Sequence, residues 1–566
     1  EDTGDIRVFG DFTGSVLAQP GDIDMTVMGT ISTDGIDADA AIPDPNGGNI
    51  AVTVGGNISG KVAADNDLTL NVLWGDVHDG ELLANGDVAI SVFGGIRGTE
   101  IDAGNGQGQD AASIAVMRNL NGVDIGTGSA VNLLELAAYG PEANDFTLQA
   151  GGGADILLFE SLIDPRINAA GNITLLTHRS LIGEGMGIGG SCVEASSGGK
   201  VDLTVMGDIA FTEVSGPEGV DLAAAGRILF SSVDSSNGSV DILAGEKSVL
   251  SSSSGYEVSA AGDVRIMSLG DFVGGICAGE DIQAVLLGNH SSAVGAGGNI
   301  DILCLGEIRS SSAIADGISA GVDANVYALG EIAPSGVAAG RDVRIASDTR
   351  VNIASGYGDN DGVLAGRDIV LLFSEGDIEG YYAAGRDVGG VRCHGDLTNA
   401  HIETLATNGD GWDIKDVSVR GDVEGSTLDA AGDIERMTVR GAIAATAPPS
   451  RIRAGGRLGK LLAYAGIDAV MTAGDFAPGG QDQDIGSIVT WGSLAGTITA
   501  EEGLIGEVRA GGAITAAIED GDELPVTPDT EVEDDYTVFG VYPGDEPFTW
   551  SVIDEERVDV WSLARV

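Results

Sequence analysis

Residues 362–397, GVLAGRDIVLLFSEGDIEGYYAAGRDVGGVRCHGDL, contain the phrase AGRD twice, 19 residues apart. Each copy precedes a short aliphatic segment, which ends at a second glycine phrase, EGDI or HGDL. The aliphatic residue that follows such phrases recurs along the chain at intervals of 18 to 26 residues: Val264, Ile282, Ile300, Ala324, Val343, Ile369, Val388, Ile414, Ile434 and Leu458. The quoted stretch is therefore nearly two copies of a structural repeat and not an isolated ligand-binding loop.

The segments after the glycine phrases alternate apolar and polar residues, as in VRIMS (264–268) and IDILC (300–304). A period of two predicts β-strands with one buried side and one solvent-facing side. No helical pattern separates them, which excludes βαβ units and favours coils that stack as parallel strands. Glycine at the corners permits positive φ or close passage of the next coil, and the following Asp or Asn can bond backbone groups at the turn. The sequence predicts an all-β fold, a parallel, right-handed β-helix or β-solenoid of roughly 20 coils.

The repeat extends over residues 1–518 and loosens in 98–170, where GNGQGQD and GTGS predict longer loops. From residue 519 the composition changes: four prolines and two tryptophans occur, and the glycine-Asp anchor disappears. We expect an acidic linker over 519–535, followed by two or three strands that do not belong to the solenoid. The predicted organisation is a solenoid of residues 1–518 and a carboxyl-terminal segment of residues 519–566.

The composition limits the partners. The chain has 28 Lys and Arg residues against 87 Asp and Glu residues, a formal net charge of −59. Such a field repels phosphate backbones and anionic lipids, which excludes nucleic acid and membrane surfaces as partners. No apolar run reaches the roughly 18 residues of a membrane helix, so we expect no membrane insertion. The acidic composition is typical of a secreted or cell-surface protein of a marine or otherwise salt-exposed bacterium.

Two segments carry a resemblance to a known group of proteins. AGGNIDILCLGEI (296–308) and AAGNITLL (169–176) are similar to the repeats of filamentous haemagglutinin and other secreted bacterial β-helix proteins. That resemblance implies a secreted surface rod or adhesin, although the amino-terminal secretion domain of the haemagglutinin family is not evident in this sequence. The motif therefore indicates the fold more directly than the function.

The ends of the predicted solenoid are the first candidate functional sites. The chain opens directly with a repeat phrase, GDIRVFGDF (4–12), and an uncovered end coil offers unpaired backbone groups and an open apolar core. The aromatic segment 519–566 either caps the last coil or contacts the first coil of a second copy, which would produce a head-to-tail homopolymer. The candidate assembly residues are Ile6, Val8, Phe9, Tyr536, Phe539, Tyr542, Phe548, Trp550 and Trp561.

Two glycine-flanked loops are candidate calcium sites. GYGDNDGV (356–363) contains Asp359, Asn360 and Asp361, and NGDGWDIKD (408–416) contains three more carboxylates: Asp410, Asp413 and Asp416. Oxygen ligands at such spacing suit Ca²⁺, the one cofactor that the sequence suggests. Neither loop matches an EF-hand or a calcium nonapeptide, so the alternative is that these side chains bond the backbone of their own turns.

Catalytic motifs are weak. GMGIGG (185–190) precedes turn and strand sequence instead of the helix that a dinucleotide requires, and Ser319 in GISAG lies in the repeat register. Cys304 and Cys393 occupy core positions of the repeat and are expected to be small buried residues. The sequence therefore favours a non-enzymatic extracellular structural protein, a subunit of a filament, sheath or surface layer. The alternatives are an adhesin or stalk that binds extracellular polysaccharide, and a β-helix polysaccharide lyase or hydrolase with clustered carboxylates.

Overall fold

The computed structural model describes residues 5–17, 21–37, 48–104, 111–135, 143–144, 146–159, 161–183, 191–229, 231–246, 248–249, 258–291, 293–309, 317–353, 362–405, 412–444, 446–474, 484–501, 505–520, 523–526 and 537–540. Within these residues the chain forms β-strands and no helix.

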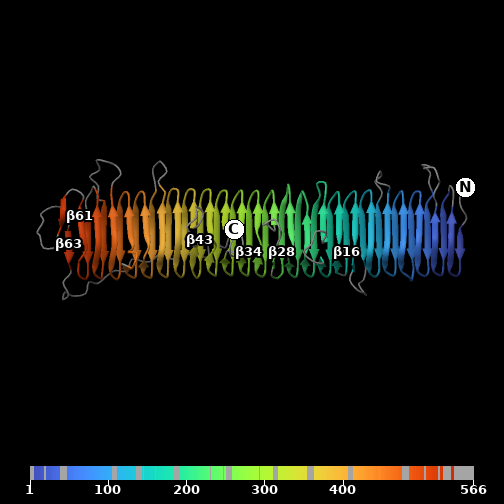
Figure 1. The fold of residues 1–566 in the computed structure, drawn as a ribbon, viewed down its shortest axis with the longest axis horizontal. Coiled ribbons are helices and arrows are strands. Elements are labelled where there is room, and N and C mark those ends of the chain that lie inside the picture. The colour runs from blue at the N-terminus through green and yellow to red at the C-terminus, as the bar shows by residue number, and fades with distance from the viewer. Residues whose placement is uncertain are drawn as a thin grey trace, which may run out of the picture.

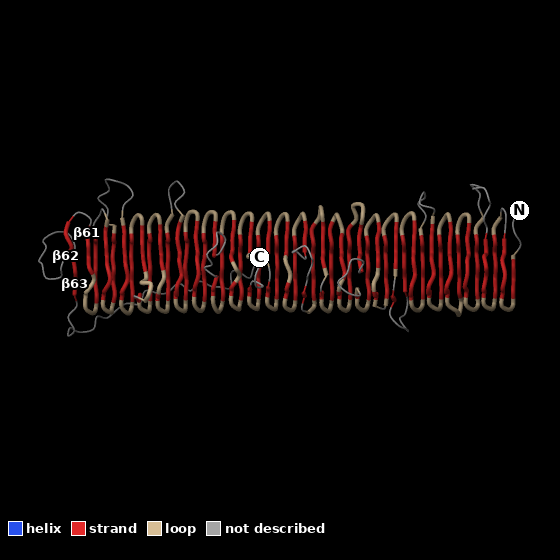
Figure 2. The backbone as a smooth tube through the Cα atoms, in the orientation of Figure 1, coloured by secondary structure: helices blue, strands red, loops and turns tan. Residues whose placement is uncertain are grey.

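The chain winds into a long rod whose strands run across the long axis, with the first coils at one end and the last at the other (Figures 1 and 2). Coils that are neighbours in sequence are therefore neighbours in space. The predicted all-β, parallel β-solenoid is confirmed. One sheet of 25 strands runs along the whole rod. At about 4.8 Å between neighbouring strands, the rod is about 115 Å long.

One face of the rod, sheet A, contains one strand from each coil. Its strands are β1 (Ile6–Val8), β3 (Ile23–Val27), β5 (Ile50–Val54), β7 (Leu68–Val72), β9 (Val88–Val92), β11 (Ala112–Val116), β13 (Val131–Glu135), β16 (Ala154–Leu158), β19 (Ile173–Thr177), β22 (Lys200–Val205), β25 (Gly219–Ala224), β28 (Ser239–Ala244), β31 (Val264–Ser268), β34 (Ile282–Leu286), β37 (Ile300–Cys304), β40 (Ala324–Ala328), β43 (Val343–Ser347), β46 (Ile369–Ser374), β48 (Val388–Cys393), β50 (Ile414–Val419), β53 (Ile434–Val439), β56 (Leu458–Ala463), β58 (Ile485–Thr490), β60 (Ile505–Ala510) and β63 (Thr537–Gly540).

The register of sheet A matches the repeat seen in the sequence. Ile282 pairs with Ile300, and Ile300 pairs with Ala324 in the next coil. The aligned aliphatic anchors are thus stacked positions in successive coils. The interval from Ile282 to Ile300 is 18 residues and that from Ile300 to Ala324 is 24, so an insertion within a coil leaves the stack intact.

The remaining strands, sheet B, form the other sides of each coil. They are β2 (Phe12–Leu17), β4 (Ile31–Asp37), β6 (Ile58–Ala64), β8 (Val77–Ala84), β10 (Ile96–Ala103), β12 (Leu120–Thr127), β14 (Ala143–Asn144), β15 (Thr147–Ala150), β17 (Leu162–Ile163), β18 (Arg166–Ala169), β20 (Leu181–Ile182), β21 (Ser191–Ala195), β23 (Ile209–Ala210), β24 (Thr212–Ser215), β26 (Ile228–Leu229), β27 (Ser232–Ser235), β29 (Ser248–Val249), β30 (Val258–Ala260), β32 (Phe272–Val273), β33 (Ile276–Ala278), β35 (His290–Ser291), β36 (Val294–Ala296), β38 (Ile308–Arg309), β39 (Ile318–Ala320), β41 (Ile332–Ala333), β42 (Gly336–Ala339), β44 (Val351–Ile353), β45 (Gly362–Ala365), β47 (Ile378–Ala384), β49 (Leu397–Thr404), β51 (Val423–Glu424), β52 (Thr427–Ala430), β54 (Ile443–Ala444), β55 (Arg451–Ala454), β57 (Ile467–Ala473), β59 (Leu494–Ala500), β61 (Ala517–Asp520) and β62 (Glu523–Val526).

Sheet B bends once per coil. In the early coils one long strand makes the bend at a residue with positive φ, Gly60 (95°), Asp79 (50°) or Gly98 (55°). In the middle coils the bend divides the strand into two short ones, such as β32 and β33. Residues without a β-carbon, or with a short polar side chain, adopt this left-handed conformation at the lowest cost, which explains their place at the corner.

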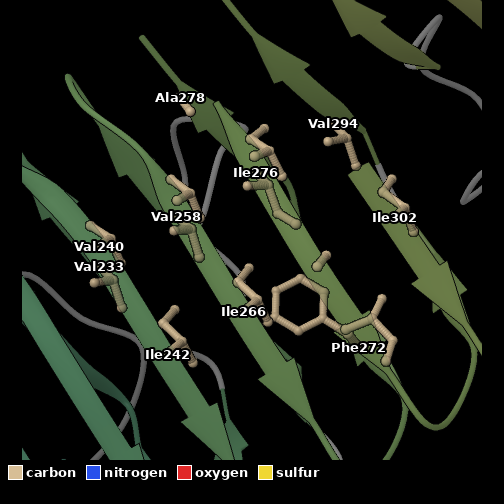
Figure 3. Close-up of a cluster of buried hydrophobic side chains, with 14 of the residues drawn as sticks. Val233, Val240, Ile242, Val258, Ile266, Phe272, Ile276, Ala278, Val294 and Ile302 are labelled. Carbon is tan, nitrogen blue, oxygen red and sulfur yellow. The ribbon is translucent and has the colours of Figure 1, made fainter. Parts of the chain in front are cut away.

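The core is a continuous column of aliphatic side chains between the two sheets. Figure 3 shows side chains of sheet A, such as Val240 and Ile242, pointing into the same interior as Val233 and Val258 of sheet B. Full burial of each such side chain stabilises the fold by about 1.5–3 kcal/mol. Cys304 and Cys393 are buried free thiols, which confirms their prediction as core residues.

The stacking direction changes near the carboxyl-terminal end. β61 is parallel to β59, but β62 pairs with β61 in the antiparallel direction, the single antiparallel pair among the described strands. β63 pairs in parallel with β60, and Phe539 of β63 lies opposite Arg509 of β60. The change falls close to the composition boundary at residue 519.

Candidate functional site

The first candidate sites are the two calcium loops. Asp359, Asn360, Asp361 and Asp410 lie outside the described residues. The Asp413 carboxylate accepts the main-chain N–H of Asp433 at 2.8 Å, and the Asp416 carboxylate accepts from Arg436 Nε at 2.8 Å. In the part of the chain that the structure describes, no three His, Cys, Asp or Glu side chains are arranged as a metal site. Asp413 and Asp416 thus have structural partners, and calcium binding stays a prediction.

Asp413 belongs to a ladder that follows one edge of sheet A. At this edge an Asp or Asn precedes each of many strands, and its side-chain oxygen accepts the main-chain N–H of the equivalent residue one coil later. Asp263 accepts from Asp281 at 3.2 Å, Asp281 from Asn299 at 2.7 Å, and Asn299 from Asp323 at 3.3 Å. These bonds explain the recurrent Asp or Asn of the glycine phrases: the side chain replaces part of the backbone pairing that the corner interrupts.

A second ladder follows the opposite edge of sheet A. Asp271 accepts the N–H of Asn289 at 2.9 Å, and Asp377 accepts the N–H of Asp396 at 2.8 Å. The second glycine phrase of the repeat therefore has the same role as the first. Both ladders place carboxylates about 4.8 Å apart along the rod, a spacing at which like charges repel.

Arginine offsets this repulsion in the AGRD coils. Arg341 Nε donates to Asp323 at 2.8 Å and Arg367 Nε to Asp342 at 2.8 Å, and Arg386 makes the same contact with Asp368. In each pair the guanidinium of one coil holds the carboxylate of the preceding coil through two nitrogens. The hydrogen bond from Arg341 holds the pKa of Asp323 below its usual value.

The charge is divided unevenly along the chain. Residues 1–340 contain 11 Lys and Arg against 46 Asp and Glu, whereas residues 341–460 contain 14 against 19. The first segment is therefore strongly negative and the second nearly neutral. This division gives the rod a charge asymmetry along its axis.

The amino-terminal end of the solenoid is an open edge within the described residues. Ile6 and Val8 of β1 are only partly buried, although they pair in register with Met25 and Val27, which are fully buried one coil later. Phe9 is 88% exposed. The difference arises because, among the described residues, β1 packs against a coil on one side only.

The other predicted assembly residues belong to the carboxyl-terminal segment. The backbone of Phe539 lies in β63 beside β60. Tyr536, Tyr542, Phe548, Trp550 and Trp561 lie outside the described residues. The structure therefore places the amino-terminal members of the predicted contact at the end of the rod and leaves the contact itself as a prediction.

The outer face of sheet A carries a surface that the sequence analysis missed. Eight large apolar side chains, each 36–53% exposed, gather on strands β28 to β40 and the turns that follow them: Leu243, Met267, Leu269, Val285, Leu287, Leu303, Leu305 and Leu329. We call this set the apolar face. The signal was present in the sequence, since ILCLG places leucines at solvent-facing positions where the alternation predicts polar residues.

Carboxylates lie beside the apolar face. Asp202, Asp221 and Asp241 are stacked in three successive coils and line a shallow groove of about 350 Å³ together with Arg265. Lys200 pairs with Asp221, and Arg265 Nη1 lies 3.6 Å from Asp241. This column is the described arrangement that comes nearest to the carboxylate cluster expected of a β-helix polysaccharide lyase.

The two weak catalytic motifs differ in their outcome. Ser319 lies within β39, stacked between Gly295 and Ala338 of the adjacent coils, and is not at a strand-to-helix turn. A nucleophile elbow requires such a turn, so Ser319 is a repeat residue. The segment GMGIGG (185–190), between β20 and β21, lies outside the described residues.

These features define the class of the protein: a long, acidic, parallel β-solenoid that exposes apolar side chains at its first coil and on one face. Comparison with protein-family models, curated proteins and solved structures gave no match. The fold that the haemagglutinin resemblance implied, a parallel β-solenoid, is the one observed. Among the described residues no helix is long and apolar enough to cross a membrane.

Proposed function

We propose that this chain is a secreted structural protein, a subunit of a filament, sheath or surface layer outside a bacterial cell. Its function would be mechanical: stacked parallel strands and a continuous aliphatic core make a stiff rod. The filamentous haemagglutinin resemblance and the acidic composition support an extracellular, salt-exposed location. The single observation that carries the proposal is the partly exposed apolar side of β1, which packs against one coil only among the described residues.

The assembly step follows from that edge. Among the described residues β1 pairs with β3 alone, and Ile6, Val8 and Phe9 present apolar surface. The last coil of a second copy, together with its residues 519–566, would supply the missing strands and aromatic side chains. Such a heterologous contact does not close on itself and therefore propagates as a filament.

The acidic surface has a role in this assembly. A net charge of −59 keeps the sides of the rods apart in solution, and residues 519–566, with 15 Asp and Glu against two Arg, add the same repulsion at the end contact. Added salt or Ca²⁺ screens the repulsion and would strengthen both end contacts and side contacts. Calcium at residues 356–363 and 408–416 would then act as a cross-link between rods.

The test compares filament formation by the full chain, by a chain that lacks residues 519–566, and by Val8→Asp. Light scattering and negative-stain imaging should detect filaments of the full chain and single rods of the two variants. Leu405→Asp, at a residue 38% exposed away from the ends, is the matched control and should form filaments. Unchanged filaments in both end variants would reject the end contact, and discrete rods that bind a glycan array would favour the adhesin.

One observation favours an enzyme as the second candidate. The column of Asp202, Asp221 and Asp241 beside Arg265 could bind an acidic polysaccharide through its cations and supply a base. Ion pairs with Lys200 and Arg265 already occupy two of these carboxylates, which weakens the case. Release of unsaturated products from acidic polysaccharides, abolished by Asp221→Asn, would establish this function in place of the structural one.

A further inference from the structure

Among the described residues no segment covers the apolar face. Eight half-exposed apolar side chains on adjacent coils form a patch on the order of several hundred Å², at the upper end of what monomeric proteins expose. The patch lies on the outer side of a parallel sheet with in-register strands, and the shallow groove beside Asp241 reaches Leu243, Met267 and Val285. A face with regular rows fits another face whose rows have the same spacing.

A second copy of this chain has such a face. Consider a two-fold axis that runs parallel to the strands, between β34 and β37. Rotation about it turns one sheet A to face the other, keeps each row of side chains opposite the same row, and reverses the order of the coils. Strand β34 then faces β37 of the partner, β31 faces β40, and β28 faces β43.

The first outward-facing residues of successive strands form a row along sheet A. In the proposed arrangement this row faces the same row of the second copy in reversed order, and the facing residues are complementary. Its residues are Asp241, Arg265, Gln283, Asp301, Asn325 and Arg344, stacked in register. Reversal of the coil order places Asp241 opposite Arg344, Arg265 opposite Asn325, and Gln283 opposite Asp301. Every contact joins a donor to an acceptor, and no pair has like charges.

The next two rows match in apolar character. The middle row places Val285 opposite Leu303 and Met267 opposite Tyr327, while the small Ala346 lies opposite Leu243. The last row places Leu287 opposite Leu305 and Leu269 opposite Leu329. Large apolar side chains thus meet in four of these five pairs, and all eight members of the apolar face become covered.

The charges beyond the apolar face also favour the reversed order. The pairing brings the acidic coils before residue 245 onto the coils of residues 341–460, which hold half of the cations of the chain. In sheet A, Asp155 of β16 would face Arg436 of β53, and Asn132 of β13 would face Lys460 of β56. A parallel arrangement would lose this match.

The available area is sufficient for a stable dimer. The ten strands of sheet A from β22 to β48 span about 48 Å along the rod and about 17 Å across it. The product, about 800 Å² for each partner, equals the size of a standard protein–protein interface.

We propose that two copies of this chain pair side by side and antiparallel through the outer faces of sheet A, about a two-fold axis between β34 and β37. The contact is lateral and isologous, so it is independent of the end-to-end contact proposed above and would convert single filaments or rods into pairs.

The test measures the mass per unit length of the full chain, by small-angle scattering and sedimentation, in 0.15 M and 0.5 M salt. Lateral pairing doubles this quantity, whereas end-to-end growth leaves it unchanged. Leu303→Glu, next to the axis and present twice in the dimer, should raise the dissociation constant by about tenfold or more. Leu405→Glu is the control, because its exposure of 38% matches the 39% of Leu303 on a different surface.

A charge exchange tests the antiparallel register. Asp241→Arg and Arg344→Asp should each weaken pairing, and the double variant should restore it, because each Asp241 faces Arg344 of the partner. A single-rod mass per length at both salt concentrations would overturn the proposal. So would equal effects of Leu303→Glu and Leu405→Glu, or a double variant that pairs no better than the single ones.

Discussion

At the residue scale, the glycines of the repeat have two different roles. Most sit where the chain passes close under the next coil, as Gly366 does, whose added β-carbon would lie 2.3 Å from the carbonyl oxygen of Gly340. A smaller group bends sheet B with positive φ, and Gly380 in the opening stretch belongs to it. The sequence identified glycine turns but could not separate these roles, because the second depends on φ.

Gly380→Ala should destabilise the solenoid by about 1–3 kcal/mol, because its φ is +123° and the new β-carbon would lie 1.9 Å from the carbonyl oxygen of Ile353. Denaturant unfolding followed by circular dichroism measures the change. Gly295→Ala is the control, since no heavy atom lies within 4 Å of its β-carbon position. Equal stability of the two variants would show that the bend tolerates a side chain.

The pair of Asp323 and Arg341 should make stability depend on pH. The hydrogen bond from Arg341 lowers the pKa of Asp323 in the folded chain below the ordinary 3.8. The stabilisation is therefore complete above pH 4 and disappears as the pH falls through the lowered pKa. Arg341→Met should lower the free energy of unfolding by about 0.5–1 kcal/mol at pH 7, a value typical of a half-exposed ion pair, and by less at pH 2.5. Unfolding free energies at both pH values measure this, and a difference that grows in acid would contradict it.

At the element scale, the strands of sheet A were predictable and those of sheet B only in part. Period-two segments such as VRIMS and IDILC became β31 and β37, because a five-residue strand with one buried side leaves a clear pattern. Two-residue strands such as β32 and β35 are too short to alternate. Their backbone pairing comes from the neighbouring coils, which a local pattern does not contain.

The hydrogen-bond partners in the ladders could not be predicted without the register of the strands. The sequence suggested that Asp and Asn bond their own turns, but Asp281 bonds Asn299, 18 residues later. The 4.8 Å spacing of coils brings that N–H within reach, and the sequence offset varies with each insertion. The residue type was therefore predictable, and the partner was not.

Asp281→Ala should lower the free energy of unfolding by about 1–2 kcal/mol. The Asp281 carboxylate accepts hydrogen bonds from both the main-chain and the side-chain nitrogen of Asn299, at 2.7 and 3.1 Å, and the variant loses both. Asp281→Asn keeps the accepting oxygen and should be nearly neutral. Unfolding free energies, with hydrogen exchange of the Asn299 amide, separate the two variants. If both lose the same stability, the charge and not the hydrogen bond is the stabilising feature.

At the scale of the whole molecule, the sequence predicted the rod and its acidic surface, but not the apolar face. Leu303 and Leu305 read as ordinary members of a repeat until the register placed them beside Val285 and Leu287. The same register brings Asp202, Asp221 and Asp241 together from three coils. Surfaces of a solenoid are assembled from residues about 20 positions apart, so they become visible only when the coils are aligned.

Salt should stabilise the rod unevenly. The coils before residue 340 hold 46 acidic against 11 basic residues, whereas those of 341–460 hold 19 against 14. Screening of the self-repulsion by 0.5 M salt should therefore slow hydrogen exchange mainly in the first group. A uniform change along the rod would mean that the local charge does not control its stability.

The central claim is that the rods join end to end. Cryo-electron microscopy of the full chain at 0.15 M salt tests it most directly, because it measures both the axial repeat and the strand spacing across each junction. If the rods join in this way, filaments form with an axial repeat of about one rod length, 115 Å, and strands continue across the junction at about 4.8 Å. A population of separate rods of that length, with no end-to-end contacts at any protein concentration, would contradict it.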